Sequence, residues 1–296
     1  MYTLKTDRIT VTVAEPNKEC RTCRFDRAGF VTAVKLDGKY DFLAQEDMLD
    51  GSPSSGGMGL CCEIQCDPMS ENAKIGEQFP KFGVGNLTKE KEGAYFFMDS
   101  YPCEDYEVAV KEEADCLTFT TAPKELGGYA VSEVKKVAVK DNTLVLTTTL
   151  KNAGSKAITF DEYCHNFMSL NRKKVNPDYA LEIPCLELPV GEIKTVDVAT
   201  CFHSDGKALS KSEESMVFAL YAFEKTQMKP VSGAYGWTLT DTSNGLCVSE
   251  TDDFHVDKVT VWSVGDAISP EMFFHASLQP GEEVTWSRTY TFDKKN

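Results

Sequence analysis

Strict alternation of side-chain character is the feature that most restricts how this chain can fold. Over residues 284–292, Val, Trp, Arg, Tyr and Phe at even positions alternate with Thr and Ser at odd positions. A period of two is that of a β-strand whose two faces meet different surroundings. The same pattern predicts further strands at residues 9–13, 118–121, 143–150, 195–202 and 256–262.

Polar turn signals such as Asp37-Gly38, Asp141-Asn142 and Pro280-Gly281 separate these strands. Many short strands joined by polar turns are typical of a β-sandwich or barrel. Residues 210–223 have helical spacing, but they can equally be read as a loop followed by a strand. Because no low-complexity linker or repeat divides the 296 residues, we expect one mainly β domain spanning residues 1–296.

The charge balance argues against two classes of partner. The chain has 31 basic and 46 acidic side chains, a formal net charge of −15, which repels nucleic acid and anionic membranes. The first residues, MYTLKTDRITVTV, do not resemble a secretory signal, and the longest apolar run, residues 216–223, is far shorter than the ~20 residues that cross a bilayer. We therefore expect a cytoplasmic protein.

The eleven cysteines are expected to be reduced thiols. A zinc site with four thiolates can be assembled from the pair Cys20 and Cys23 and from the group Cys61, Cys62 and Cys66. The spacing within the second group, however, is not that of a zinc knuckle. We therefore predict no metal and interpret the cysteines as buried or half-buried thiols. The Gly-rich segment 47–59 is either a mobile loop over a site or a plain surface connection, and it lacks the Gly-Lys-Ser/Thr ending of a phosphate-binding loop.

A family resemblance begins at residues 161–171, DEYCHNFMSLN, where His165, Phe167 and Leu170 follow a strand, a turn and a strand. Farther along, Glu271 follows Ser-Pro, and a Pro-Gly-Glu turn at 280–282 precedes the closing strand. These segments, in this order and spacing, resemble the aldose 1-epimerases, the galactose mutarotase-like proteins. The segments 24–30, RFDRAGF, and 79–83, FPKFG, are similar to uncharacterised bacterial members of that family.

The resemblance implies a galactose mutarotase-like supersandwich of antiparallel strands with a sugar cleft on one face. It implies that Glu271 removes the proton of the anomeric hydroxyl while His165 protonates the ring oxygen of a hexose or modified hexose, with no cofactor. We expect an ionised carboxylate facing a protonated imidazole, with room for one pyranose between them and with Asp161 or Glu162 favouring the imidazolium.

The predicted sugar contacts are Arg24, Lys81 and Asn166, with Asp252 or Asp253 as further candidates and Trp262 or Phe254 as stacking residues. The run 172–174, Arg-Lys-Lys, is interpreted as a solvated turn.

Two other functions remain open on the sequence alone. The first is a non-catalytic carbohydrate-binding protein of the same fold, in which the cleft survives but the acid–base pair no longer works. The two residues can also have purely structural roles, with His165 satisfying a backbone carbonyl at a strand end and Glu271 lying in a solvated turn. The second is a lyase or hydrolase acting on a polysaccharide, which the lack of an export signal disfavours.

Overall fold

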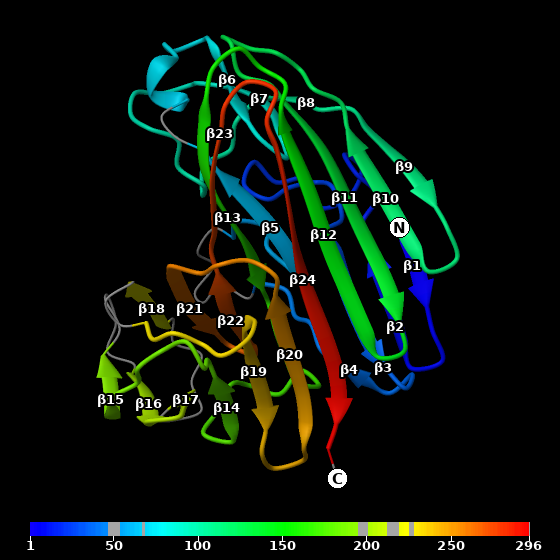
Figure 1. Cartoon of the computed structure of the whole chain (residues 1–296), viewed down its shortest axis with the longest axis vertical. Coiled ribbons are helices and arrows are strands. Elements are labelled where there is room, and N and C mark those ends of the chain that lie inside the picture. Colours follow the sequence, from blue (N-terminus) through cyan, green and yellow to red (C-terminus); the bar gives the residue numbers. More distant parts are fainter. Residues whose placement is uncertain (47–53, 67–68, 195–200, 212–218, 225–227, 296) are drawn as a thin grey trace.

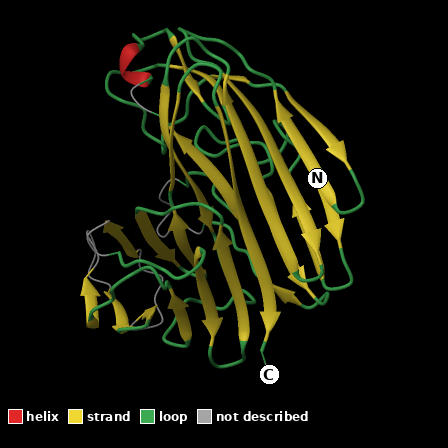
Figure 2. Cartoon of the chain, in the orientation of Figure 1, coloured by secondary structure: helices red, strands yellow, loops and turns green. Residues whose placement is uncertain are grey.

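The computed structural model describes residues 1–46, 54–66, 69–194, 201–211, 219–224 and 228–295. These residues form antiparallel strands joined by loops, with one short 3-10 helix, η2 (Ser70–Asn72) (Figure 2). The mainly β, antiparallel class predicted from the alternation is confirmed.

One of the two large sheets has seven strands in the described residues, in the order β1-β2-β3-β5-β13-β23, with β4 paired to β3. Its strands are β1 (Tyr2–Lys5), β2 (Ile9–Val13), β3 (Val31–Leu36), β4 (Tyr40–Asp41), β5 (Leu60–Gln65), β13 (Ile158–Asn166) and β23 (Phe274–Leu278).

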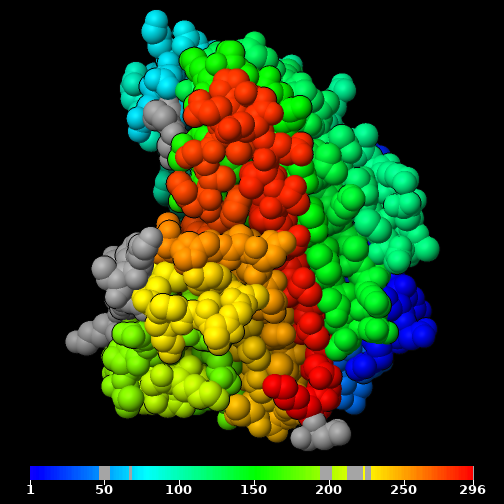
Figure 3. Space-filling view, viewed as in Figure 1, coloured from blue at the N-terminus to red at the C-terminus, as the bar shows by residue number. Residues whose placement is uncertain are grey.

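The other large sheet has eleven strands in the part of the chain that is described, in the order β15-β16-β17-β14-β19-β20-β24-β12-β11-β10-β9. Its strands are β9 (Val108–Glu112), β10 (Cys116–Thr121), β11 (Val131–Lys140), β12 (Thr143–Asn152), β14 (Tyr179–Glu182), β15 (Val190–Lys194), β16 (Cys201–Asp205), β17 (Ala208–Lys211), β19 (Tyr235–Asp241), β20 (Leu246–Asp252) and β24 (Glu283–Lys294). On the face shown in Figure 3, β24 (red) runs between β12 (green) and β20 (orange).

Two three-stranded sheets complete the described strands. One contains β6 (Gln78–Lys81), β7 (Gly85–Thr88) and β8 (Cys103–Asp105), and the other contains β18 (Ala219–Glu224), β21 (Lys258–Val264) and β22 (Ala267–Met272) (Figure 1). Met168, just past β13, and Ile268 of β22 form an antiparallel bridge, which joins the second of these sheets to the seven-stranded sheet.

Most predicted strands are confirmed. The segments 9–13, 118–121, 143–150, 256–262 and 284–292 coincide with or fall largely within β2, β10, β12, β21 and β24. The predicted strand 195–202 lies mainly outside the described residues. The segment 210–223 could be either a helix or a loop followed by a strand. Its described ends belong to β17 and β18, so they are strands rather than a helix.

The main core lies between the two large sheets, where the inward faces of the strands are mostly apolar. In β24, Trp286, Tyr290 and Phe292 are buried, and the Phe292 ring meets Phe42, which follows β4, at 5.1 Å between centroids. The alternation also turns Arg288 inward, where its Nη1 lies 2.7 Å from Oε2 of Glu162 on β13. Burial of a charge requires such a partner.

A second buried ion pair links Lys135 of β11 to Asp26, which lies between β2 and β3. Lys135 is 2% exposed, and its ammonium group also lies 3.5 Å from a carboxylate oxygen of Glu133. The next residue along the strand, Lys136, is exposed on the opposite face. The two lysines therefore differ only in the face that each occupies.

The cysteines follow the predicted pattern of thiols within a packed structure. Cys61, Cys62, Cys164, Cys185 and Cys247 are buried, and the other described cysteines with assigned burial are half-buried. Across the described ranges, no three side chains of His, Cys, Asp or Glu converge as a metal site would require. No helix among the described residues is long and apolar enough to span a membrane.

The buried Lys135 pair predicts a large difference between two neighbouring substitutions. Lys135→Met should lower the free energy of unfolding by about 3–5 kcal/mol, because it leaves the Asp26 carboxylate buried without its counter-ion. Lys136→Met, the matched control, should change it by less than about 0.5 kcal/mol. Urea unfolding of both variants tests this, and equal losses would contradict the assigned burial.

Candidate active site

A cavity of about 370 Å³ opens over one face of β13, β21 and β22. Alternation within the strands selects the residues that face it, because every second side chain points to the same side. Strand β13 contributes Tyr163 and His165, and β22 contributes Glu271. The full lining is Arg24, Glu46, Gln65, Phe97, Met98, Tyr163, His165, Lys258, Thr260, Trp262, Glu271 and Phe273.

Strand register arranges this face in rows. The Met168–Ile268 bridge sets β22 antiparallel to β13, and continuing that register brings His165 beside Glu271 and Tyr163 beside Phe273. Pairing of β21 with β22 places Thr260 opposite Glu271. The middle row is therefore His165, Glu271 and Thr260, and the next row is Tyr163, Phe273 and Lys258.

The two residues predicted to be catalytic are in direct contact. Nε2 of His165 lies 3.2 Å from Oε1 of Glu271, and the Ser269 hydroxyl donates a hydrogen bond of 3.1 Å to the same oxygen. The expectation that a pyranose fits between the two side chains is wrong at this separation. Within the described residues, only the cavity side of the pair has room for a ligand of that size.

Aromatic rings enclose the imidazole of His165. The Phe167 ring stacks on it at 4.0 Å, and the Trp262 ring meets it edge-on at 5.1 Å between centroids. The side chain is only 4% exposed, and Nδ1 is buried without a hydrogen-bond partner among the described residues. Asp161 and Glu162, the predicted partners of the imidazole, instead contact His275 and Arg288.

Burial shifts the two ionisable groups in opposite directions. It lowers the pKa of His165 well below its usual value, and the positive charge of Arg24 adds to this effect. It raises the pKa of Glu271 to about 8, although Arg24 and the Ser269 hydrogen bond act against it. Both shifts favour uncharged groups, so the ion pair expected from the sequence is replaced by a neutral imidazole and a protonated carboxyl.

A charged cluster supports one wall of the cavity. The Arg24 guanidinium donates from Nε to Glu63 at 2.9 Å, from Nη1 to Ser55 at 3.1 Å and from Nη2 to the Tyr163 hydroxyl at 2.7 Å. Lys81 donates to the other oxygen of Glu63 at 2.8 Å. Burial alone would raise the pKa of Glu63, but Lys81 and Arg24 lower it to about 2.

Of the three predicted sugar contacts, only Arg24 lines this cavity. Lys81 lines a smaller neighbouring cavity of about 200 Å³. Asn166 follows His165 on the strand and so points to the opposite face, where its amide donates to Glu250 at 3.1 Å and to the Pro270 carbonyl at 2.6 Å.

The remaining candidate sugar contacts divide in the same way. Trp262 faces the cavity, whereas Phe254 packs in the main core. Asp252 and Asp253 do not belong to the lining that the described residues form. Asp252 is buried, and an oxygen of Asp253 accepts a hydrogen bond from the Ser287 backbone.

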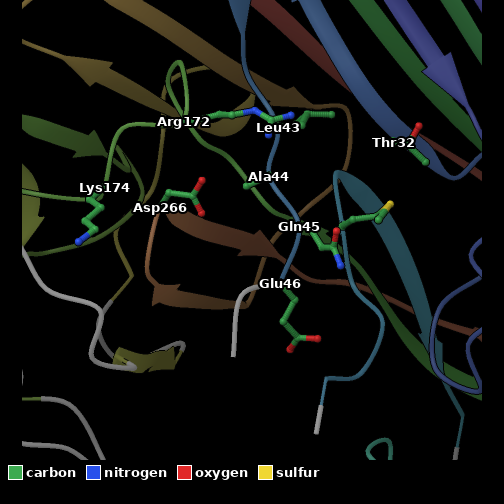
Figure 4. A pocket seen from close by; sticks show the side chains of 9 residues that line it. Thr32, Leu43, Ala44, Gln45, Glu46, Arg172, Lys174 and Asp266 are labelled. Atoms are coloured by element: carbon green, nitrogen blue, oxygen red, sulfur yellow. The ribbon is translucent and has the colours of Figure 1, made fainter. Parts of the chain in front are cut away.

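The run 172–174 is divided between two environments. Lys173 binds Asp178 at 2.9 Å, whereas Arg172 and Lys174 are exposed and line a second cavity of about 630 Å³ (Figure 4). Glu46 lines both this cavity and the one that holds His165. Of the Gly-rich segment 47–59, residues 47–53 lie outside the described residues.

Several cavity residues were missed by sequence reasoning. Tyr163 lies two positions before His165, Phe273 two positions after Glu271, and Thr260 two positions before Trp262. The period-two alternation that identified the strands would have placed each of them on the face of its neighbour. Glu63 carried no such signal, because its role depends on pairing between β5 and β13.

The pKa values of two buried carboxyls, Glu271 and Glu63, are shifted in opposite directions, so the two groups should lose their protons at very different pH values. The Glu271 carboxyl should titrate with a midpoint near pH 8, whereas Glu63 should stay ionised to about pH 2. Carbon NMR of protein labelled at the glutamate side-chain carboxyls measures both, with the signals assigned by their loss in Glu271→Gln and Glu63→Gln. A Glu271 midpoint near that of an exposed glutamate, about 4.3, would contradict the prediction.

Comparison with solved structures reveals the fold. A protein of Synechocystis sp. PCC 6803 matches with a TM-score of 0.62 and 15% identity over 99% of this chain and 96% of that one. A galactose mutarotase-like protein of Lactobacillus casei matches with a TM-score of 0.62 and 13% identity, covering 99% and 100% of the two chains. A galactose mutarotase related enzyme of Lactobacillus acidophilus matches with a TM-score of 0.59 and 13% identity, covering 99% and 97%.

No protein-family model and no curated protein matches the sequence. The structural likeness nevertheless extends over nearly the whole chain, and it agrees with the antiparallel sheets described above. This chain has the galactose mutarotase-like fold.

Proposed function

We propose that this protein is an aldose 1-epimerase-like mutarotase, which interconverts the α and β anomers of a hexose or modified hexose. The observation that carries the proposal is the 3.2 Å contact between His165 and Glu271 in the cavity. The galactose mutarotase-like fold supports it, because solved proteins with this fold include ones described as related to that enzyme.

The closeness of the two side chains suits the chemistry of ring opening. The anomeric hydroxyl oxygen and the ring oxygen of a pyranose are bonded to the same carbon, C1. An acid and a base that act on these two oxygens together must themselves be neighbours. A sugar lying across the pair can present one oxygen to each side chain.

In the opening step, the Glu271 carboxylate removes the proton of the anomeric hydroxyl while His165 gives a proton to the ring oxygen. The bond between C1 and the ring oxygen breaks, and C1 becomes an aldehyde. Rotation about the C1–C2 bond and the reverse proton transfers close the ring as the other anomer. Each group therefore acts once as acid and once as base, and the pair needs one proton for the whole cycle.

The pKa directions are consistent with a pair that carries this single proton. Near neutral pH the proton resides on Glu271, since burial raises the pKa of that carboxyl and lowers the pKa of His165. Without substrate, the pair therefore has a protonated Glu271 and a neutral His165, which is also its protonation state after ring opening. Transfer of the same proton across the 3.2 Å contact restores the imidazolium that begins the cycle.

The remaining lining can bind the sugar without a cofactor. Arg24 uses three of its five N–H groups on Ser55, Glu63 and Tyr163, which leaves two for sugar hydroxyls. Trp262, Tyr163 and Phe273 supply ring surfaces on which the apolar face of a pyranose can pack.

One observation favours the second candidate, a carbohydrate-binding protein of the same fold without catalysis. His165 is 4% exposed beneath aromatic rings, which restricts its access to a sugar oxygen. In such a protein the cavity binds a sugar but the rate of anomer exchange does not change. Kinetics distinguishes the two functions directly.

Two substitutions test the proposed roles. His165→Ala and Glu271→Gln should each slow anomer exchange at least about 100-fold, the usual contribution of a positioned acid or base. His275→Ala is the matched control, because this imidazole is exposed and contacts Asp161 at 2.7 Å. Exchange of α and β anomers is followed by NMR magnetisation transfer. Sugar binding without acceleration by the unsubstituted protein would favour the binding protein, and full acceleration in both site variants would contradict the roles assigned to His165 and Glu271.

The pH dependence follows from the proton on the pair. Because burial raises the pKa of Glu271 to about 8, the pair keeps its proton below that pH and loses it above. We expect kcat/KM to fall about tenfold per pH unit above pH 8, as one proton is lost. Polarimetry from pH 6 to 10, corrected for uncatalysed exchange, measures this. A profile that stays level through pH 10 would contradict the one-proton pair.

A further inference from the structure

A lysine occupies the row beside the proposed acid and base. Lys258 lies on β21 two residues before Thr260, and Thr260 lies opposite Glu271 in the strand register. Because alternate residues share a face, Lys258 lines the same cavity as the pair. Its Nζ lies 4.1 Å from the centre of the Phe273 ring.

Lys258 differs from the other cationic residues of this region in its partners. Arg24 and Lys81 both pair with Glu63. No described carboxylate lies within ion-pair distance of Lys258, which contacts an aromatic ring instead. Glu46, another acidic residue of the lining, has an oxygen that accepts hydrogen bonds from Ser54 and Ser55. The half-buried Lys258 side chain therefore presents a positive charge to the cavity, and a negatively charged group of a ligand can pair with it.

The strand geometry gives the position of that ligand charge. Two residues along a strand span about 6.6 Å, so the row of Lys258 lies about that far from the row of His165 and Glu271. In a pyranose, the ring oxygen is bonded to both C1 and C5, and C5 carries C6. A sugar with C1 over the acid–base pair can extend over the Tyr163 and Phe273 rings and bring a C6 substituent to Lys258.

We propose that the site takes a pyranose carrying an anionic group at C6, a carboxylate or a phosphate, with Lys258 as its counter-ion. This inference rests on the proposed function for the placement of C1. A neutral hexose leaves the ammonium unpaired inside the cavity, whereas a hexuronate or a hexose 6-phosphate neutralises it. A ligand that pairs its negative charge with this ammonium is favoured over a neutral one by a charge-assisted hydrogen bond.

The experiment compares glucose, glucuronate and glucose 6-phosphate as substrates of the wild-type protein and of Lys258→Met. The wild type should act on at least one anionic sugar with kcat/KM at least about tenfold above that for glucose, the effect of one charge-assisted hydrogen bond. Lys258→Met should lose at least about tenfold with that sugar and less than about threefold with glucose. The glucose arm controls for the influence of the Lys258 charge on Glu271, whose pKa it lowers.

Lys156→Met is the matched control for the loss of a lysine that lies over an aromatic ring. Nζ of Lys156 lies 4.8 Å from the centre of the Tyr129 ring, outside the cavity. This variant should keep the wild-type preference. Lys258→Arg should retain most of the preference for the anionic sugar, since it keeps the positive charge. Urea unfolding confirms that all three variants are folded.

Binding measured by calorimetry separates failure of this inference from failure of the proposed function. If no sugar is turned over but the wild type binds an anionic sugar at least about tenfold tighter than Lys258→Met does, Lys258 recognises the anion and the mutarotase proposal fails alone. If glucose is turned over as well as both anionic sugars, or if Lys258→Met weakens all three sugars equally, the inference is overturned. The anionic sugar with the larger loss in Lys258→Met identifies the group as carboxylate or phosphate.

Discussion

The antiparallel register between β13 and β22 is the constraint on which the candidate site depends. The two strands belong to different sheets and are joined where Met168 pairs with Ile268. A shift of one residue would turn Glu271 away from the cavity, because neighbouring side chains on a strand point to opposite faces. A hydrogen bond from the Asn166 side chain to the Pro270 carbonyl holds the same register from the other face, and one from the Asn166 backbone N–H to the Ser269 hydroxyl supports it. Asn166 thus supports the alignment of the site from within the core.

Burial determines how the ionisable groups of this protein are paired and which of them stay uncharged. Between the large sheets, buried cations meet buried carboxylates, as in the pairs of Lys135 with Asp26 and Arg288 with Glu162. Beside the cavity, the buried Glu63 carboxylate likewise pairs with Arg24 and Lys81, which lower its pKa to about 2. Glu271 faces His165 rather than a cation at contact distance, so its pKa rises to about 8. Near neutral pH, Glu63 is therefore ionised while Glu271 is protonated, which agrees with a structural role for Glu63 and with the acid–base role proposed for Glu271.

The alternation of residues 284–292 was sufficient to predict β24 and to place Arg288 on the same face as Trp286 and Tyr290. It could not predict which strand lies beside β24 or that Glu162 meets Arg288, because pairing between distant strands leaves no mark on local periodicity. The likeness of the segments around His165 and Glu271 to a known family brought together two residues that lie far apart in the sequence. Their separation of 3.2 Å and their shared neutral state were not predicted, because the separation follows from the register of β13 and β22 and the neutral state follows from burial.

Sequence alone determined several strands of this protein, its mainly β class and, through the family resemblance, the two side chains at the centre of the site. Those properties are local, or are carried by short motifs, so they can be read without knowing what packs against them. Tertiary structure decided the rest. It turned Asn166 into the core, directed Lys81 to a neighbouring cavity and placed Lys258 in the row beside Glu271. These positions depend on register and on burial, which arise only when strands distant in sequence come together.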